Sequence, residues 1–105
     1  MRYSPESLQA FVLAVEKGSF SAAARALGKS QSTVSAAIAN LEADLGFKLF
    51  HRESREPVLT EAGGRALRQV EEILAASQRL DELAIRLSDN VEPRLSMAIS
   101  DFWQA

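Results

Sequence analysis

Residues 22–46 read AAARALGKSQSTVSAAIANLEADLG, and this stretch decides the fold. A short run of helix-forming residues ends at Gly28, and a longer run with apolar side chains at helical spacing begins after Ser30. Glycine ends a helix readily because it tolerates a positive φ, whereas a serine hydroxyl caps the start of a helix. The stretch therefore predicts two helices, residues 22–27 and about 31–45, joined by a tight turn as in a helix-turn-helix.

The longer of these helices has two different faces. Its buried face is predicted to hold the apolar residues Val34, Ile38, Leu41 and Leu45. The opposite face carries short side chains: Gln31, Ser32, Ser35, Ala36, Ala39 and Asn40. Gly46 is expected to end the helix.

Further elements are predicted on both sides of this stretch. A first helix is expected to start at Pro5 behind the cap Ser4 and to end at Gly18, with an apolar stripe of Leu8, Phe11, Val12 and Val15. Ser21 is expected to cap the helix at 22–27. Beyond Gly46, the extended runs 47–52 and 58–60, joined by a turn at 53–57, predict a β-hairpin.

A long helix is predicted from about Glu61 to Ser88, where no proline occurs. Its apolar positions alternate in steps of four and three residues, as in a coiled coil: Ala66, Val70, Ile73, Ser77, Leu80, Ala84 and Leu87. A head of about 60 residues cannot cover so long a stripe, so the helix is expected to pair with a second copy of itself. Ser77 either tunes the register of that seam or is merely tolerated in it.

The last residues predict a hinge at 89–93 and an alternating segment at Leu95–Ile99. One strand without a neighbour is not stable alone. The segment is therefore either a frayed tail or the first strand of a further domain that the sequence does not contain.

Composition excludes several classes of protein. The 105 residues include no Cys and one His, so disulfides, Cys-based metal sites and a nucleophile–His pair have no support. No stretch is long and apolar enough for a membrane span or a signal peptide, and we expect a cytoplasmic protein without metal or cofactor. No phosphate-cradling glycine loop or other catalytic motif argues for an enzyme.

The charge distribution matters more than the net charge of −2. Residues 1–60 hold seven Lys and Arg against six Asp and Glu, whereas residues 61–105 hold five against eight. The predicted helix 31–45 has no cation, and its short polar side chains suit base edges in a major groove. Glutamine, for example, can make a bidentate contact with adenine. Attraction to phosphates must come from flanking residues: Arg25, Lys29, Lys48, Arg52 and Arg55.

Motifs in a fixed order carry a resemblance to a known family: AARAL (23–27), SQSTVS (30–35), Ile38, Leu41-Glu42, Leu45-Gly46, Leu49-Phe50, Arg52, Arg55 and LTEAG (59–63). With them the sequence resembles the LysR-type transcriptional regulators over nearly all of residues 5–64. The resemblance implies a winged helix-turn-helix, a linker helix that forms a homodimer, and a C-terminal domain that binds a small-molecule effector. It also suggests antiparallel pairing of the linker helices and allows a higher oligomer of the full-length protein.

The resemblance also implies roles for individual residues. Gln31, Ser32 and Ser35 match positions that contact bases, and Arg55 matches a wing residue that enters the minor groove. The sugar–phosphate backbone would be contacted by Arg25, Lys29, Thr33 and Arg52. Many members carry Arg where this sequence has Ala36, so this helix lacks one long charged contact.

Plainer explanations exist for several of these residues. Ser30 can act as a helix cap without touching DNA, and Gln31 and Ser32 can be solvated residues of a first turn. Arg55 stands between Glu53 and Glu56, which would screen its charge. Arg52 can pair with Glu42 or Glu53, and His51 is expected at the surface or at a strand edge.

The sequence thus predicts a mainly α protein. Residues 1–60 would form a winged helix-turn-helix, 61–88 a dimerising linker helix, and 89–105 a hinge with a first strand. The predicted function is sequence-specific binding of double-stranded DNA for transcriptional regulation. The alternative is a helical protein-interaction or dimerisation module without specific DNA binding.

Overall fold

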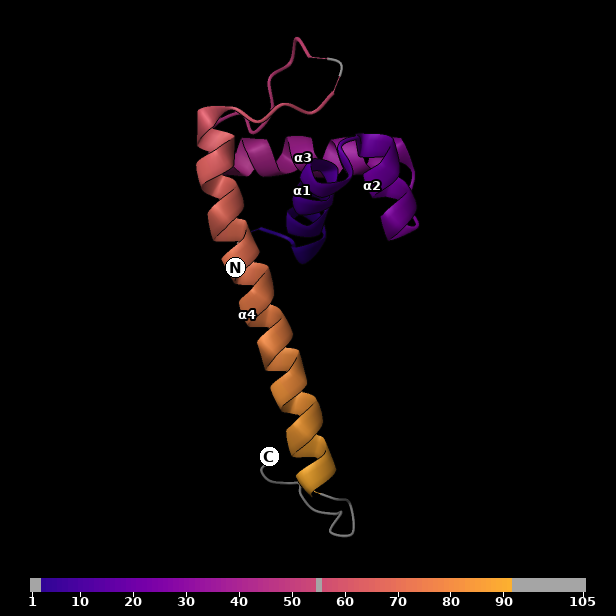
Figure 1. Cartoon of the computed structure of the whole chain (residues 1–105), viewed down its shortest axis with the longest axis vertical. Helices are drawn as coiled ribbons and strands as arrows, with labels where there is room; N and C mark the ends of the chain where they lie inside the picture. Colours follow the sequence, from indigo (N-terminus) through magenta and orange to yellow (C-terminus); the bar gives the residue numbers. More distant parts are fainter. Residues whose placement is uncertain (1–2, 55, 92–105) are drawn as a thin grey trace. The chain divides into compact units, whose positions relative to one another are not determined.

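A computed structural model describes residues 3–54 and 56–91. Its helices are α1 (Pro5–Lys17), α2 (Phe20–Leu27), α3 (Gln31–Leu45) and α4 (Glu61–Val91), as Figure 1 shows. The mainly α class and the bounds of α3 are therefore confirmed. The chain divides into two compact units, residues 1–74 and 75–105, and their boundary lies within α4.

Hydroxyl groups start all four of these helices. Ser4 accepts from the backbone N–H of Ser7 at 3.1 Å, and Ser30 accepts from that of Thr33 at 3.2 Å, so both predicted caps are confirmed. The prediction that Ser21 caps the second helix is wrong. Ser19 has the extended backbone of a cap and accepts from Ala22 at 2.9 Å, so α2 begins two residues earlier than expected.

The turn between α2 and α3 depends on Gly28. Its φ of +68° lies in the left-handed region, which side chains with a Cβ rarely adopt. With this conformation the N–H of Lys29 reaches the carbonyl oxygen of Ala24 at 2.9 Å and closes the end of α2. Ser30 can then cap α3 at once, which makes the connection as tight as a helix-turn-helix requires.

The core of the first unit lies where α1, α2 and α3 pack against one another. The small side chains Ala23 and Ala24 are buried and allow α2 to approach its neighbours closely. Phe50 comes from the loop after α3 and packs edge-on against Phe11 and Phe20, with ring centroids 5.6 and 5.5 Å apart. The loop is thereby attached to the three-helix core.

The predicted hairpin at 47–60 is present only in part. Phe50 and Leu59 form a single antiparallel bridge, and the described residues contain no longer strand. One cause limits the pairing. The N–H of Leu49 donates to Oε2 of Glu42 at 2.7 Å and is therefore not available to a strand ladder.

Thr60 connects this loop to the start of α4. Its hydroxyl donates to the carbonyl oxygen of Lys48 at 2.7 Å and accepts from the N–H of Gly63 at 2.8 Å. Its own N–H donates to the carbonyl oxygen of Leu49 at 3.0 Å. Gly63 lies so close to Leu49 that a Cβ there would overlap its carbonyl group. The motif LTEAG therefore builds a close backbone junction.

The start of α4 belongs to the core of the first unit. Val70, which the heptad pattern placed on the dimerisation seam, is only 5% exposed within a single chain. Little of this side chain is left for a partner helix to cover, and its place on the seam stays a prediction. Ala66, Leu67, Ile73 and Leu74 also pack partly against this core. The first unit consequently extends to Leu74, and the predicted domain boundaries stay predictions.

Farther along α4 the apolar side chains are open to solvent. Leu80 and Leu87 of the predicted seam are 65% and 50% exposed, and Ser77 and Ala84 are exposed as well. The helix continues to Val91, three residues past the predicted end. The remainder of the predicted hinge and the predicted strand Leu95–Ile99 lie outside the described residues. Within those residues no helix has the length and apolar character needed to cross a membrane.

Candidate nucleic-acid interface

The face of α3 opposite the core is uncovered. Gln31, Ser32 and Ala36 are exposed and Ser35 is half-buried, whereas Val34, Ile38 and Leu41 are buried on the core side. The outward face therefore presents short side chains on an element that packing holds in place. Such a face can enter a groove without steric obstruction.

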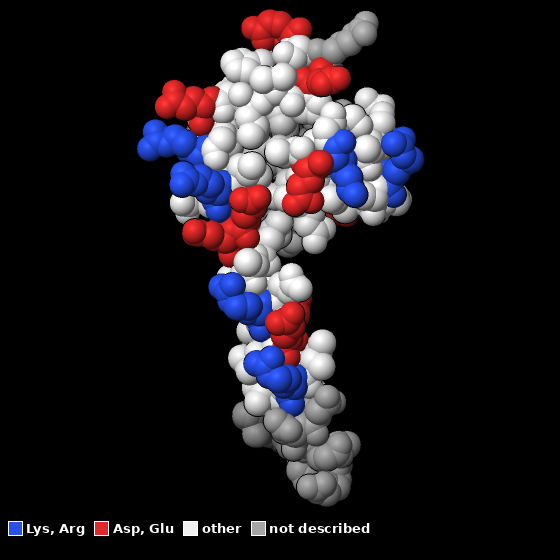
Figure 2. All heavy atoms as spheres, in the orientation of Figure 1, with Lys and Arg blue, Asp and Glu red and all other residues white. Residues whose placement is uncertain are grey.

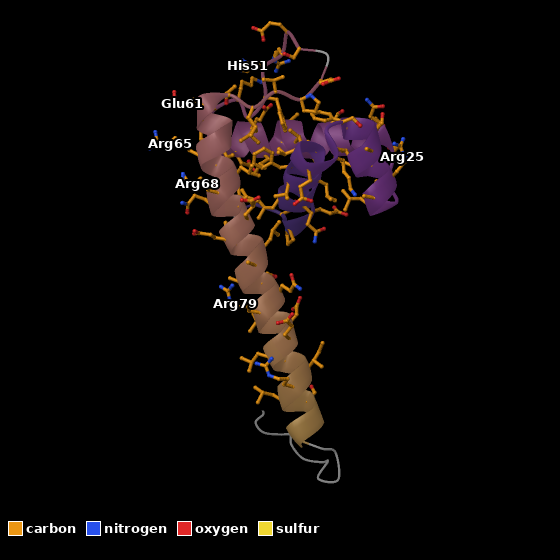
Figure 3. The ribbon with its side chains drawn as sticks, viewed as in Figure 1. Arg25, His51, Glu61, Arg65, Arg68 and Arg79 are labelled. Carbon is orange, nitrogen blue, oxygen red and sulfur yellow. The ribbon has the colours of Figure 1, made fainter. Side chains whose placement is uncertain are left out.

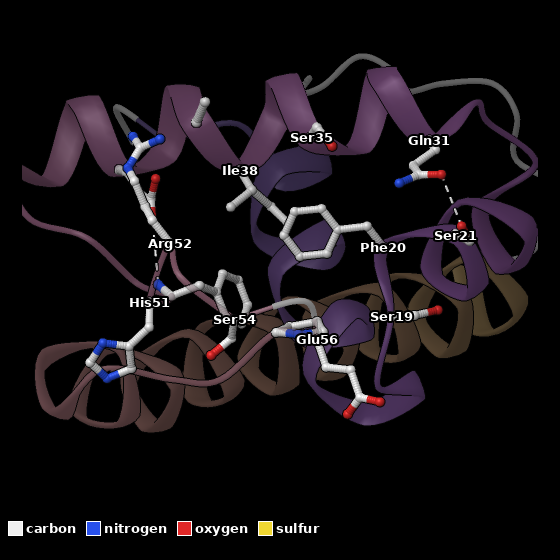
Figure 4. A pocket seen from close by; sticks show the side chains of 14 residues that line it. Ser19, Phe20, Ser21, Gln31, Ser35, Ile38, His51, Arg52, Ser54 and Glu56 are labelled. Carbon is white, nitrogen blue, oxygen red and sulfur yellow. Dashed lines mark hydrogen bonds between the residues drawn. The ribbon is translucent and has the colours of Figure 1, made fainter.

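A cavity of about 470 Å³ lies beside this face. Three segments line it: the start of α2 with Ser19 to Ser21, the α3 side chains Gln31 and Ser35, and the loop with Phe50 to Arg52, Ser54, Glu56 and Pro57 (Figure 4). Arg52 also lines it, so the structure brings together three of the predicted contact residues. The cavity marks the side of the helix-turn-helix where a ligand can touch α2, α3 and the loop together.

Three hydroxyl groups gather at the start of α3. The Ser30 hydroxyl lies 3.2 Å from that of Ser32 and 2.8 Å from that of Thr33, and it caps the helix. The cap explanation of Ser30 is thus confirmed. Ser32 and Thr33 remain exposed, so their hydroxyls can exchange these local bonds for an external acceptor.

The cations around α3 differ in their surroundings. Lys29 pairs with Glu6 at 3.2 Å, and both side chains are largely exposed. Arg25 projects from the last turn of α2 into solvent (Figure 3). Arg52 is exposed and makes no ion pair within residues 3–54 and 56–91. Arg55 lies outside the described residues.

Glu42 does not pair with Arg52, contrary to one hypothesis from the sequence. Its carboxylate accepts from the N–H groups of Leu49 and Phe50 at 2.7 and 3.4 Å and lies 3.8 Å from Nζ of Lys48. Charged acceptors bind backbone N–H groups strongly. Glu42 therefore anchors the loop to α3 and leaves the guanidinium of Arg52 available.

The surface charges are mixed. On the face that Figure 2 shows, Lys and Arg side chains alternate with Asp and Glu over the part of the chain that is described. Glu56 even lines the cavity beside α3. Attraction to an anion must consequently come from a few well-placed cations. Among the described residues no cluster of His, Asp and Glu could hold a metal ion.

Two features of this site are not evident from the sequence. Ser21 donates a hydrogen bond of 2.9 Å to Oε1 of Gln31, although ten residues separate them. His51 and Ser54 line the cavity, whereas the sequence indicated only a surface or edge position for His51. Neither feature has a periodic signal, because both depend on how the loop and α2 pack against α3.

Comparison with known proteins adds independent evidence. The family described as "Bacterial regulatory helix-turn-helix protein, lysR family" matches residues 5–64, more than half of the chain. The chain belongs to the LysR family. Its first unit thus contains the helix-turn-helix domain of this family, and the resemblance noted from the motifs is confirmed.

A curated LysR-type relative is the HTH-type transcriptional regulator AceR of Acinetobacter baumannii. It is 40% identical over 99 residues, which are 94% of this chain and 33% of AceR. The HTH-type transcriptional activator AllS of Salmonella typhimurium is 34% identical over 94% of this chain and 32% of its own length. The chain thus spans about a third of the length of these two curated relatives.

Among solved structures, the LysR-type fold occurs with DNA. The complex of the BenM DNA-binding domain with benA site 1 DNA aligns with a TM-score of 0.74 at 32% identity, over 78% of this chain and 92% of that one. The complex of the CbnR DNA-binding domain with DNA aligns with a TM-score of 0.73 at 32% identity, over 83% of this chain and 98% of that one. The alignments cover more than nine tenths of each of these two DNA-binding domains.

Proposed function

We propose that this chain binds double-stranded DNA at specific sequences and that a regulator containing it controls transcription. The observation that carries the proposal is the uncovered face of α3, with Gln31 and Ser35 beside a cavity that α2 and the loop complete. The LysR-type match and the DNA complexes of BenM and CbnR support it. A non-enzymatic role and a cytoplasmic location are part of this proposal.

In the proposed complex, α3 occupies the major groove. Its base contacts are Gln31, Ser32 and Ser35. The backbone contacts are Arg25, Lys29, Thr33 and Arg52. We propose that residues 50–59 form the wing and that Arg55 enters the minor groove. The single bridge at Phe50 and Leu59 and the anchoring of the loop by Glu42 support such a wing.

The proposed active form is a homodimer held by α4. Exposed apolar side chains from Leu80 to Leu87 support this part of the proposal. Two heads joined in this way would contact two half-sites about one helical turn apart, or a multiple of that spacing. Control by a small-molecule effector would require the further domain that the family resemblance implies and stays a prediction.

Selection from a random pool of duplex DNA tests the proposal. We expect one enriched, roughly two-fold symmetric sequence whose affinity falls steeply as salt rises, because bound cations release counterions from the phosphates. Lys29→Gln should weaken binding to most sequences and reduce the salt dependence. An affinity that depends on neither the DNA sequence nor the salt concentration would refute the proposal. It would favour the protein-interaction module that the exposed leucines of α4 also permit.

A further inference from the structure

One hydrogen bond connects the starts of the two helices of the helix-turn-helix. Ser21 is the second residue of α2 and Gln31 the first of α3. The Ser21 hydroxyl donates to Oε1 of Gln31 at 2.9 Å, at the rim of the cavity beside α3 (Figure 4). The amide of a proposed base-contacting residue is therefore held from a neighbouring helix.

Ser21 is available for this bond because other serines cap the helices. Ser19 accepts from Ala22 and starts α2, and Ser30 accepts from Thr33 and starts α3. As the cap predicted from the sequence, Ser21 would have used its hydroxyl locally. The structure releases that hydroxyl for Gln31.

The bond also orients the amide. Oε1 of Gln31 accepts from Ser21 in the first turn of α2, and the start of a helix has a positive potential. This potential favours the carbonyl oxygen at that place over the hydrogens of the amide nitrogen. Nε2, which carries two donors and no acceptor, is turned away from Ser21 (Figure 4).

We propose that Ser21 determines the base preference of Gln31 by orienting its amide so that Nε2 meets the base edge. The inference rests on the proposed function and adds the chemistry of one base position. Ser21 acts here as a positioning residue, because it works through Gln31 and needs no contact with the base.

The chemistry of the base edges gives the direction of the preference. Guanine presents two acceptors in the major groove, N7 and O6, which match a group that offers only donors. Adenine presents one acceptor and one donor, so a bidentate contact needs Oε1 and Nε2 of the same glutamine. Because Oε1 is turned towards Ser21 and Nε2 away from it, we expect guanine over adenine, in place of the adenine contact considered from the sequence.

Site selection with variants of the whole 105-residue chain tests this assignment. The position whose preference disappears in Gln31→Ala marks the base that Gln31 contacts. We expect the unchanged protein to select guanine there. In Ser21→Ala the ratio of guanine to adenine should fall about fivefold to tenfold, which is within the range that one good side-chain contact contributes.

Two further variants serve as controls. Ser21→Thr keeps the hydroxyl and should restore the preference for guanine. Ser88→Ala removes an exposed serine hydroxyl from α4, outside the helix-turn-helix, and should leave the ratio unchanged. In the Gln31→Ala background, Ser21→Ala should have no additional effect on the ratio. Thermal unfolding establishes that each variant is folded before selection.

Two results would overturn the inference while leaving the proposed function intact. One is a preference of the unchanged protein for adenine at the position marked by Gln31→Ala. The other is an unchanged ratio in Ser21→Ala with equally weakened binding to all sequences, which is what loss of a phosphate contact would produce. An unchanged protein that enriches no sequence refutes the proposed function itself, which is a separate result.

Discussion

Lys29 illustrates at the residue scale how a neighbour can limit a cation. Its ammonium group lies 3.2 Å from the carboxylate of Glu6, so part of its charge is compensated in the free protein. Exposed ion pairs contribute only about 0.2–1 kcal/mol. A DNA phosphate can therefore replace Glu6 as the partner of Lys29. Breaking the ion pair with Glu6, however, reduces the free energy gained from the phosphate contact.

Glu6→Gln should raise DNA affinity about twofold to fivefold at low salt, because the exposed pair no longer competes with phosphate. Titration of a selected duplex at two salt concentrations measures this effect. Glu16→Gln is the matched control, since it makes the same charge change on α1 at an exposed residue without an ion pair in the described part of the chain. Equal gains in both variants would show that net charge alone is responsible.

At the scale of elements, the junction between the loop and α4 depends on backbone proximity. Leu49 is involved twice: its N–H donates to Glu42 on α3, and its carbonyl oxygen accepts from Thr60 at the start of α4. A continuous series of hydrogen bonds therefore runs from α3 through the loop to α4. Gly63 permits the close approach that this arrangement requires.

Gly63→Ala should destabilise the first unit by about 1–3 kcal/mol, because the new methyl group overlaps the Leu49 carbonyl and forces the backbone apart. Denaturant unfolding at fixed protein concentration measures the change. Gly64→Ala is the matched control, since it makes the same substitution at the next residue, where a Cβ meets nothing within 4 Å. It should be neutral or stabilise by up to about 1 kcal/mol through its better helix propensity. Equal destabilisation by both substitutions would contradict the proposed junction.

At the scale of the whole molecule, the two ends of α4 differ in how far their apolar side chains are buried. Near its start, Val70 is buried in the core of the first unit. In the second unit, the seam residues Leu80, Ala84 and Leu87 are exposed in a single chain and fall at spacings of four and three residues. We therefore expect the dimer to use the later part of the seam.

Leu80→Glu should raise the dimer dissociation constant on the order of tenfold or more, because a charge would be buried in the seam without a partner. Sedimentation velocity over a concentration series measures this. Ile85→Glu makes the same change on a different side of α4, at a residue that is similarly exposed, and should have a smaller effect. A stronger effect of Ile85→Glu would relocate the interface.

Local patterns were sufficient for much of the fold. The limits of α3, the caps Ser4 and Ser30 and the turn at Gly28 follow from side-chain chemistry within a few residues, and the structure confirms them. The start of α2 was misjudged because two serines were suitable caps. Packing of Phe20 against Phe50 favours the earlier one.

The outward-facing residues of the candidate site were predictable from the sequence, but the contacts between its elements were not. The composition of α3 indicated which side chains face outward, because periodicity separates them from the buried stripe. The bond between Ser21 and Gln31, the position of His51 in the cavity and the engagement of Glu42 by the loop were not predictable. Each joins residues from different elements, and no pattern along the chain specifies such a pair.

The sequence by itself therefore determined the helices, the caps Ser4 and Ser30 and the family of this protein, because these depend on neighbouring residues and on ordered motifs. Only the tertiary structure decided that Val70 is buried within a single chain and that Ser21 donates to Gln31. The physical reason is that a stripe of apolar or polar residues specifies a face, whereas its partner depends on which surface packs against that face.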